Sequence, residues 1–235
     1  MSYILCIETG TDICSVGLVK NGELVSLRES SQGRDHAGRL GLFVDEILEA
    51  SDLKADRISA VAVSKGPGSY TGLRIGVSFA KGFCYGLGIP LIGIGSLDSL
   101  ACVACEDNNA GILGVEDWQS ALLCPMIDAR RMEVYAQVFD PSGRPVSEVG
   151  AHVIDENSFA RYAQNCSEFL IFGSGAKKCE GIIPNARYID VVPSARGLAS
   201  AAQQAFEKGQ SEDIAYFEPL YLKDFVITQS KKKIF

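Results

Sequence analysis

The sequence has 235 residues, of which 47% are apolar, and this is enough to bury one large core or two smaller ones. Its formal charge of -7, from 22 Lys and Arg against 29 Asp and Glu, argues against a protein that binds RNA unaided, because that affinity comes largely from neutralising phosphates. No apolar stretch approaches the roughly 20 residues of a membrane-spanning helix, and eight cysteines are scattered through apolar segments, so we expect a cytoplasmic protein without membrane association.

The first 30 residues predict three consecutive strands. Residues 4–7 and 14–19 are apolar runs of strand length, separated by a polar turn from Glu8 to Asp12. Asn21-Gly22 then leads into a third run and is typical of a tight hairpin turn. An amphipathic helix is predicted next, because apolar residues follow the helical spacing at Leu40, Phe43, Val44, Ile47 and Leu48.

A glycine-rich loop, residues 64–72, follows a short buried strand at residues 58–63. The next helix carries small residues at every fourth position: Gly72, Gly76, Ala80, Cys84 and Gly88. Each glycine inside a helix costs up to about 1 kcal/mol relative to alanine. Close approach of another backbone, within the domain or from a partner, is the compensation that we expect.

The second half repeats the pattern of the first. After a strand at residues 89–94 and a helix from Ser96, residues 122–128 form another apolar run with an acidic end. A shift of 120 residues places Asp128 on Glu8, and a Ser-Gly turn nearly coincides with Asn21-Gly22. We therefore predict an α/β protein with two duplicated lobes, residues 1–105 and 106–235, facing a cleft.

Two turns and one bend are candidates for nucleotide binding. Backbone N–H groups of a small polar turn can surround a phosphate, and an acid at a strand end can hold a hydrated magnesium ion. A Gly-x-Gly bend lets a backbone approach an adenine-ribose group. The candidate site comprises Glu8, Thr9, Gly10, Thr11, Asp128, Gly173 and Gly175. A purely structural hairpin and a strand-to-helix turn explain these residues as well.

No catalytic residue and no metal site are predicted. The loop from Gly66 to Gly72 has the composition of an anion cradle, but it lacks the Lys-Ser or Lys-Thr of a Walker A loop. Neither His36 nor His152 has a second histidine at helical spacing, as a zinc pair requires. The Cys102-Cys105 pair lies in a predicted helix and is interpreted as core.

Several motifs taken together resemble the TsaB (YeaZ) family. The most specific is the run Gly66-Pro67-Gly68-Ser69-Tyr70-Thr71-Gly72-Leu73-Arg74. The others are Ile4 to Thr9, Asp35-His36-Ala37, Ala80-Lys81-Gly82, Asp128-Ala129-Arg130, Glu133-Val134-Tyr135 and Pro219 to Lys223. The resemblance covers nearly the whole chain.

The resemblance implies an actin/Hsp70/sugar-kinase (ASKHA) fold, with duplicated ribonuclease H-like lobes whose mixed sheets are flanked by helices. It implies a non-catalytic dimerisation or scaffold subunit of the complex that makes N6-threonylcarbamoyladenosine in tRNA. Such a subunit stabilises and activates the catalytic TsaD, works with the ATPase TsaE, and meets tRNA only through the complex. The catalytic relative carries paired metal-binding histidines, whereas here His36 is followed four residues on by Leu40.

The resemblance also implies a place for the partner, on the first two long helices. The residues that the resemblance assigns to this partner interface are His36, Leu40, Phe43, Ile47, Tyr70, Thr71, Leu73, Arg74, Gly76, Val77, Ala80, Lys81 and Cys84. On this view Gly76→Leu prevents pairing and leaves the monomer folded. A homodimer through the same surface is expected when no partner is present.

Nucleotide binding is expected to be weak. Glu8 and Gly10 stand where the family usually has Asp and often Ser, so we expect no tightly bound cofactor, and ATP or ADP only weakly or at the partner interface. The alternative function is an ATP-dependent kinase or hydrolase of the same fold. Turnover of magnesium-ATP by the isolated chain would separate the two.

Overall fold

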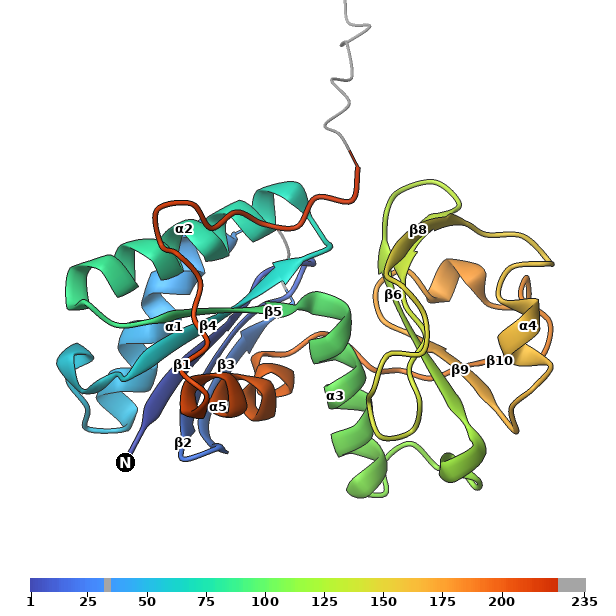
Figure 1. Ribbon diagram of the computed structural model, residues 1–235, viewed down its shortest axis with the longest axis horizontal. Coiled ribbons are helices and arrows are strands. Elements are labelled where there is room, and N and C mark those ends of the chain that lie inside the picture. The colour runs from blue at the N-terminus through green and yellow to red at the C-terminus, as the bar shows by residue number, and fades with distance from the viewer. Residues whose placement is uncertain (32–34, 224–235) are drawn as a thin grey trace, which may run out of the picture.

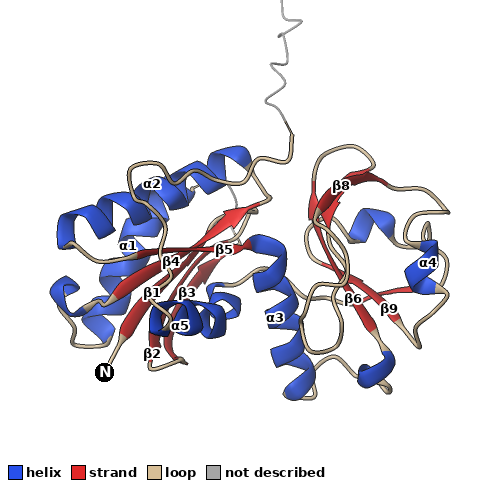
Figure 2. Cartoon of the chain, in the orientation of Figure 1, coloured by secondary structure: helices blue, strands red, loops and turns tan. Residues whose placement is uncertain are grey.

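A computed structural model describes residues 1–31 and 35–223. The chain folds into two five-stranded sheets with their flanking helices, and one helix lies between the two sheets (Figure 1). Figure 2 shows that the first half carries long helices while the second is mostly strand and loop. The basic run Lys231-Lys232-Lys233, interpreted from the sequence as a solvated tail, lies outside the described residues.

The first sheet has the strand order β3-β2-β1-β4-β5. The first three strands are antiparallel neighbours, whereas β4 and β5 run parallel to β1. Asn21 and Gly22 both have positive φ, as the predicted hairpin turn requires. The bounds are β1 Tyr3–Glu8, β2 Cys14–Lys20, β3 Glu23–Ser30, β4 Ala60–Gly66 and β5 Leu91–Gly95.

The second sheet repeats this topology. Its order, β8-β7-β6-β9-β10, matches the first sheet strand for strand, with an antiparallel meander followed by two parallel strands. The predicted duplication of ribonuclease H-like lobes in the actin/Hsp70/sugar-kinase fold is confirmed. The bounds are β6 Leu122–Asp128, β7 Glu133–Ala136, β8 Gly150–Val153, β9 Phe169–Phe172 and β10 Ala186–Tyr188.

Helices cover both faces of the first sheet. One face packs on α1 (His36–Ala50) and α2 (Tyr70–Leu87), and the other on α5 (Ala199–Glu207) and the preceding 3-10 turn η4 (Ala195–Leu198). The central strands β1 and β4 are consequently buried on both faces. Their mixed Val, Ile, Cys and Ala composition, without polar alternation, is typical of strands in such a position.

The second lobe has much shorter helices than the first. Helix α3 (Ser96–Asn109) packs on β6 and on η4, and thus lies between the lobes. The connections after β8 and β9 contain one helical turn each. These are α4 (Ala160–Ala163) and η3 (Lys177–Cys179); η1 (Ala55–Arg57) and η2 (Trp118–Ser120) lie elsewhere.

The chain returns to the first lobe before it ends. Ala195, Leu198 and Ala202 pack with residues of β1, β4 and β5 in one apolar cluster. The predicted boundaries, 1–105 and 106–235, therefore need correction, because the residues from Ala195 onward complete the first lobe. The sequence repeat could not show this return, since α5 contributes to the first lobe from outside the repeated unit.

Residues 212–223, here called the strap, cross the first lobe after α5 and run beside α2 (Figure 1). The strap begins where Glu212 N–H donates to Leu91 O at 2.8 Å. Leu220 N–H donates to Lys65 O at 2.6 Å, at the start of the glycine-rich loop. Lys223 then pairs with Glu133 of the second lobe. The strap thus contacts both lobes.

Within residues 1–31 and 35–223, no helix is both long enough and apolar enough to cross a membrane.

Candidate functional site

Glu8, at the end of β1, is the first residue of the predicted nucleotide site. Its carboxyl group is buried, with 1% of the residue exposed, and Oε1 accepts a hydrogen bond of 2.6 Å from Gly10 N–H. Oε2 makes no hydrogen bond of ordinary geometry among the described residues, although the Ser64 hydroxyl lies near enough to oppose the rise in the pKa of Glu8. A buried, half-satisfied carboxyl group is unfavourable in its charged form.

The glycine-rich loop closes over this turn. Ser69 N–H donates to Gly10 O at 2.7 Å, and Thr9 Oγ1 donates to Gly72 O at 2.9 Å. A Cβ on Gly68 would lie 2.4 Å from Gly10 O, and one on Gly72 would lie 2.1 Å from Thr9 O. The loop glycines therefore permit direct contact between the backbone of the loop and that of the turn.

Residues 8–11 of the turn are accordingly buried, whereas Asp12 at its end is exposed. Thr9 is 0% exposed and Thr11 is 7% exposed. His36 Nε2 donates to Thr11 O at 2.8 Å, so the first residue of α1 is fixed to the same turn. These contacts engage Thr9 Oγ1 and the Gly10 and Thr11 carbonyl oxygens with the chain's own atoms, and they favour the interpretation as a structural hairpin.

Burial raises the pKa of Glu8 to about 7, although the Gly10 N–H bond opposes the shift. Since the folded state holds the proton more tightly than the unfolded chain, the free energy of unfolding should fall as pH rises from about 4.5 to 7. The slope from this group is at most about 1.4 kcal/mol per pH unit, and the total is about 3 kcal/mol.

Urea titrations at pH 5.0 and 7.5 test this expectation. Glu8→Gln keeps an acceptor for Gly10 N–H and cannot ionise, so its stability should change less than that of the wild type between the two pH values. Comparing the two proteins cancels the titration of all other groups. Parallel profiles for the two proteins would show that Glu8 is not protonated on folding.

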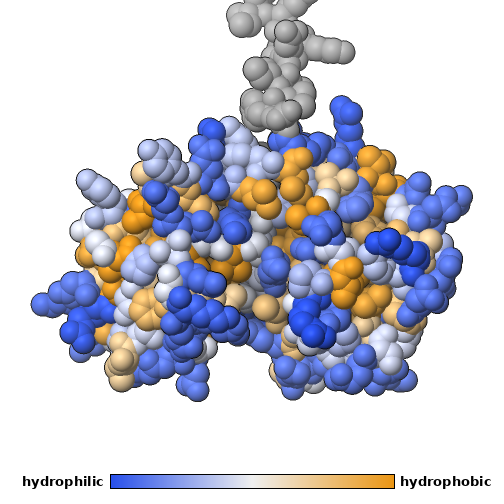
Figure 3. All heavy atoms as spheres, viewed as in Figure 1, coloured by the Kyte–Doolittle hydropathy of each residue, from blue (hydrophilic) through white to orange (hydrophobic). Residues whose placement is uncertain are grey.

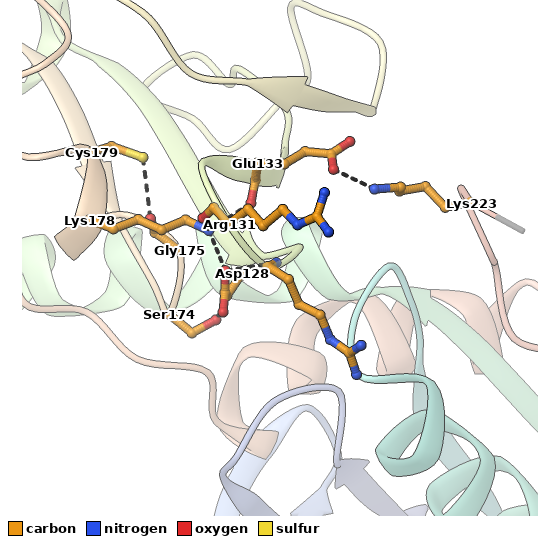
Figure 4. Close-up of polar contacts among 9 residues, drawn as sticks. Asp128, Arg131, Glu133, Ser174, Gly175, Lys178, Cys179 and Lys223 are labelled. Atoms are coloured by element: carbon orange, nitrogen blue, oxygen red, sulfur yellow. Dashed lines mark hydrogen bonds and ion pairs between the residues drawn. The ribbon is translucent and has the colours of Figure 1, made fainter. Parts of the chain in front are cut away.

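Asp128, the predicted counterpart of Glu8, lies at the exposed end of β6 and is ion-paired (Figure 4). Lys178 pairs with its Oδ1 and donates to the carbonyl oxygens of Arg131 and Glu133, both at 2.7 Å. Lys178 thus ties the segment after β9 to the β6–β7 turn. Arg130 and Arg131 have positive φ in that turn, where the first lobe has a closed polar turn.

Gly173 and Gly175, the predicted adenine-ribose bend, pack directly on β6. A Cβ on Gly173 would lie 2.6 Å from Met126 O, and one on Gly175 would lie 2.9 Å from the Ile127 carbonyl carbon. Both positions require glycine for contact within the lobe. The two halves of the predicted nucleotide site therefore have structural roles in this chain.

Nine of the thirteen predicted partner residues face the chain's own core. Gly76 shows the reason: a Cβ there would lie 2.2 Å from Thr9 Oγ1 and 3.6 Å from Ile7. The stripe of small residues in α2 lets the helix approach β1, which is the intradomain alternative, and the interface assignment of these residues is corrected. They are His36, Leu40, Phe43, Ile47, Leu73, Gly76, Val77, Ala80 and Cys84, all buried.

The strap engages three of the remaining four residues. The Tyr70 ring lies 4.9 Å from that of Tyr221, and Arg74 Nε donates to Tyr221 Oη at 3.2 Å. Lys81 Nζ donates to the strap carbonyls of Ala215 and Phe217, at 3.3 and 3.0 Å. Thr71 is exposed.

A different surface of the same two helices is open, here called the outer face. It consists of Gly41 and Leu42 of α1 and of Ile75, Ser78, Phe79, Gly82 and Gly86 of α2. Leu42 is 54% exposed, and Cβ atoms on Gly82 or Gly86 would meet nothing within 4 Å. The face thus combines exposed apolar side chains with glycines that leave room for a close approach. On the side of the first lobe that Figure 3 shows, hydrophobic residues are interspersed with polar ones at the surface.

The sequence contained a signal for the outer face that the motif analysis missed. Gly82 and Gly86 form a second small-residue pair, about 120° and 80° around the helix from Gly76 respectively. Because Leu73 and Val77 lie on the same side as Ala80 and Cys84, that side should have been assigned to the core. The strap contacts carried no sequence signal, since they join residues more than 130 positions apart.

Outside residues 32–34 and 224–235, no group of three His, Cys, Asp or Glu side chains is placed to hold a metal ion. Cys102 and Cys105 are partly buried in α3, and burial raises the pKa of each thiol to about 11. Both thiols are therefore protonated near neutral pH, in agreement with their assignment to a helix that packs in the core.

Comparisons with known proteins agree on one group of related proteins. A family model described as TsaD, tRNA N6-adenosine threonylcarbamoyltransferase, matches residues 25–217. The tRNA threonylcarbamoyladenosine biosynthesis protein TsaB of Escherichia coli is 30% identical over 232 residues, which are 95% of each chain. Its counterpart from Haemophilus influenzae is 29% identical over 95% of this chain and 94% of its own length.

Solved structures agree with this result. YeaZ from Pseudomonas aeruginosa superposes with a TM-score of 0.77 at 25% identity, over 94% of this chain and all of the other. The fold, the glycine-rich loop packed on the first turn and the near full-length likeness lead to one conclusion. The chain belongs to the TsaB (YeaZ) family.

Proposed function

We propose that this chain is a non-catalytic subunit of a complex that makes N6-threonylcarbamoyladenosine in tRNA, where it binds and activates a TsaD-like catalytic subunit. Support comes from the named relatives, which are threonylcarbamoyladenosine biosynthesis proteins. The observation that carries the proposal is the outer face of α1 and α2. It exposes Leu42 beside glycines that allow another helix to approach closely.

The closed turn after β1 supports the non-catalytic part of the proposal. An ATP-dependent kinase or hydrolase of this fold needs phosphate-binding backbone groups at that position, and here Ser69, Thr9 and Gly72 join the turn to the loop instead. We therefore propose that the chain holds no nucleotide tightly by itself. ATP or ADP would bind weakly or at the interface with the partner.

The remaining partners follow from the same proposal. A TsaE-like ATPase would join the complex, and tRNA would contact the chain only within it, since the net charge of -7 opposes independent binding of a polyanion. Without a catalytic partner, two copies of the chain would pair through the outer face, because like helix surfaces can form a symmetric contact. The expected location is the cytoplasm.

Reconstitution tests the proposed function. The TsaD-like and TsaE-like proteins of the same organism, with tRNA, threonylcarbamoyl-adenylate and magnesium-ATP, should form modified adenosine in multiple turnovers only when this chain is added. The chain alone should modify no tRNA and release no phosphate from ATP above a buffer control. Vigorous ATP turnover by the chain alone, or a partner rate that does not respond to it, would overturn the proposal.

A further inference from the structure

Arg74, on the flank of α2 beside the outer face, is exposed and yet contacts two tyrosines. The centre of its guanidinium group lies 4.2 Å from the centroid of the Tyr70 ring. Its Nε donates to Tyr221 Oη at 3.2 Å, and the two tyrosine rings are 4.9 Å apart. Tyr70 belongs to α2 and Tyr221 to the strap, so segments distant in sequence form this clamp together.

The strap is fixed on α2 by contacts that precede Tyr221. Phe217 is buried beside Gly93, where its ring carbons lie within 3 Å of an ideal Cβ position, and it anchors the strap in the first lobe. Lys81 Nζ donates hydrogen bonds to the carbonyl oxygens of Ala215 and Phe217, and Leu220 N–H donates one to Lys65 O. These contacts fix the backbone of the strap, and the strap in turn positions Tyr221 against Arg74.

The clamp leaves the two terminal nitrogens of Arg74 available as donors. Among residues 1–31 and 35–223, neither terminal nitrogen has a hydrogen-bond partner, and no ion pair joins Arg74 to Glu218, whose charge acts on it. An exposed arginine ordinarily loses much side-chain entropy when it binds. Here stacking and the Nε bond already restrict the guanidinium, so its planar fork is presented in one orientation.

We propose that Arg74 binds a carboxylate of the catalytic partner, at the edge of the helix contact that the outer face makes. This inference rests on the proposed function and adds a specific ionic contact to it. A groove of about 320 Å³ lies between α2 and the strap at this point. Its walls include Val77, Phe217 and Pro219, which suit the methylene groups of an acidic side chain.

A carboxylate fits this groove better than a phosphate. Two carboxylate oxygens match the planar guanidinium fork in a bidentate pair. Glu218 also lines the groove, and its charge would repel a dianionic phosphate more strongly than a carboxylate. The position beside the outer face places the partner's side chain where the two subunits would already be in contact.

The test compares affinities for the purified TsaD-like subunit by isothermal titration calorimetry. Arg74→Lys keeps the charge and removes the fork, and it should weaken binding about 10-fold. Tyr221→Phe removes only the hydroxyl that fixes Nε, and it should weaken binding about threefold with an unchanged melting temperature. Arg57→Lys, at another exposed arginine, is the matched control and should bind as the wild type does.

The outcomes separate this inference from the proposed function. If the wild type binds and Arg74→Lys binds equally well, the clamp has no such role, while the proposed function stands. If the wild type does not bind at all, both fail. If Arg74→Lys weakens the binding of tRNA to the assembled complex but leaves the affinity between the subunits unchanged, Arg74 contacts phosphate and the carboxylate assignment is overturned.

Discussion

Gly82→Glu is expected to abolish binding of the catalytic partner and to leave the chain folded. A Cβ at position 82 meets nothing within 4 Å, so the glutamate side chain extends into solvent in the free chain. In the complex it would hold two helices apart and bury an unpaired charge, which costs several kcal/mol. We expect an affinity at least about 100-fold lower by calorimetry.

The free chain should gain stability from the same substitution. Glutamate is a better helix former than glycine by roughly 0.5–1 kcal/mol, and thermal denaturation should show a small rise in melting temperature. Lys54→Glu places the same glutamate side chain at an exposed position outside α1 and α2, and it should not affect binding. Unchanged affinity of Gly82→Glu would place the partner elsewhere.

Gly76→Ala should destabilise the chain by about 3 kcal/mol, through overpacking and a disturbed hydrogen bond. The new Cβ would lie 2.2 Å from Thr9 Oγ1, and that hydroxyl donates to Gly72 O. Moving the hydroxyl away breaks the bond that joins α2 to the turn after β1. The expectation that Gly76→Leu leaves the monomer folded is therefore replaced by its opposite.

Gly86→Ala is the matched control for Gly76→Ala, because it lies in the same helix with open space around its Cβ position. It should stabilise the chain by up to about 1 kcal/mol. Urea denaturation of the three proteins at one pH measures both changes. Equal stabilities for the two variants would mean that α2 does not approach β1 as closely as the structure shows.

Local patterns predicted most elements of the fold. Periodicity and turn residues predict the hairpin at Asn21-Gly22, the two long helices and the repeat of the meander. The structure contains all of them. These features depend on neighbouring residues. The closure of the first lobe by α5 was not predictable in this way, since nothing local in residues 199–207 specifies the sheet that they cover.

The candidate site was harder to predict because one residue type serves opposite purposes. Gly76 and Gly82 both lie in α2, and both are small, yet the first makes room for Thr9 and the second leaves a surface open. The angular position of each glycine around the helix, relative to the buried apolar residues, distinguishes the two roles. A short sequence motif does not contain this information. The glycine-rich loop posed the same difficulty, because an anion cradle and a close backbone contact need the same residues.

The turn after β1 and the outer face are structurally linked through α2. The loop that packs on the turn continues directly into α2 at Tyr70. Contacts that close the turn therefore also fix the position of the helix that carries the outer face. A substitution in the turn, such as Glu8→Gln, should thus be judged by partner affinity as well as by stability.

Hydroxyl-radical footprinting of the chain, alone and bound to the TsaD-like subunit, tests the central claim most directly. Leu42 of the outer face is 54% exposed, and Tyr85, one helical turn after Gly82 on α2, is 82% exposed; both should lose reactivity several-fold in the complex. Ile112 and Val153, exposed to 68% and 72% elsewhere, should react equally in both states. Protection of Ile112 or Val153, with Leu42 and Tyr85 still reactive, would contradict the account.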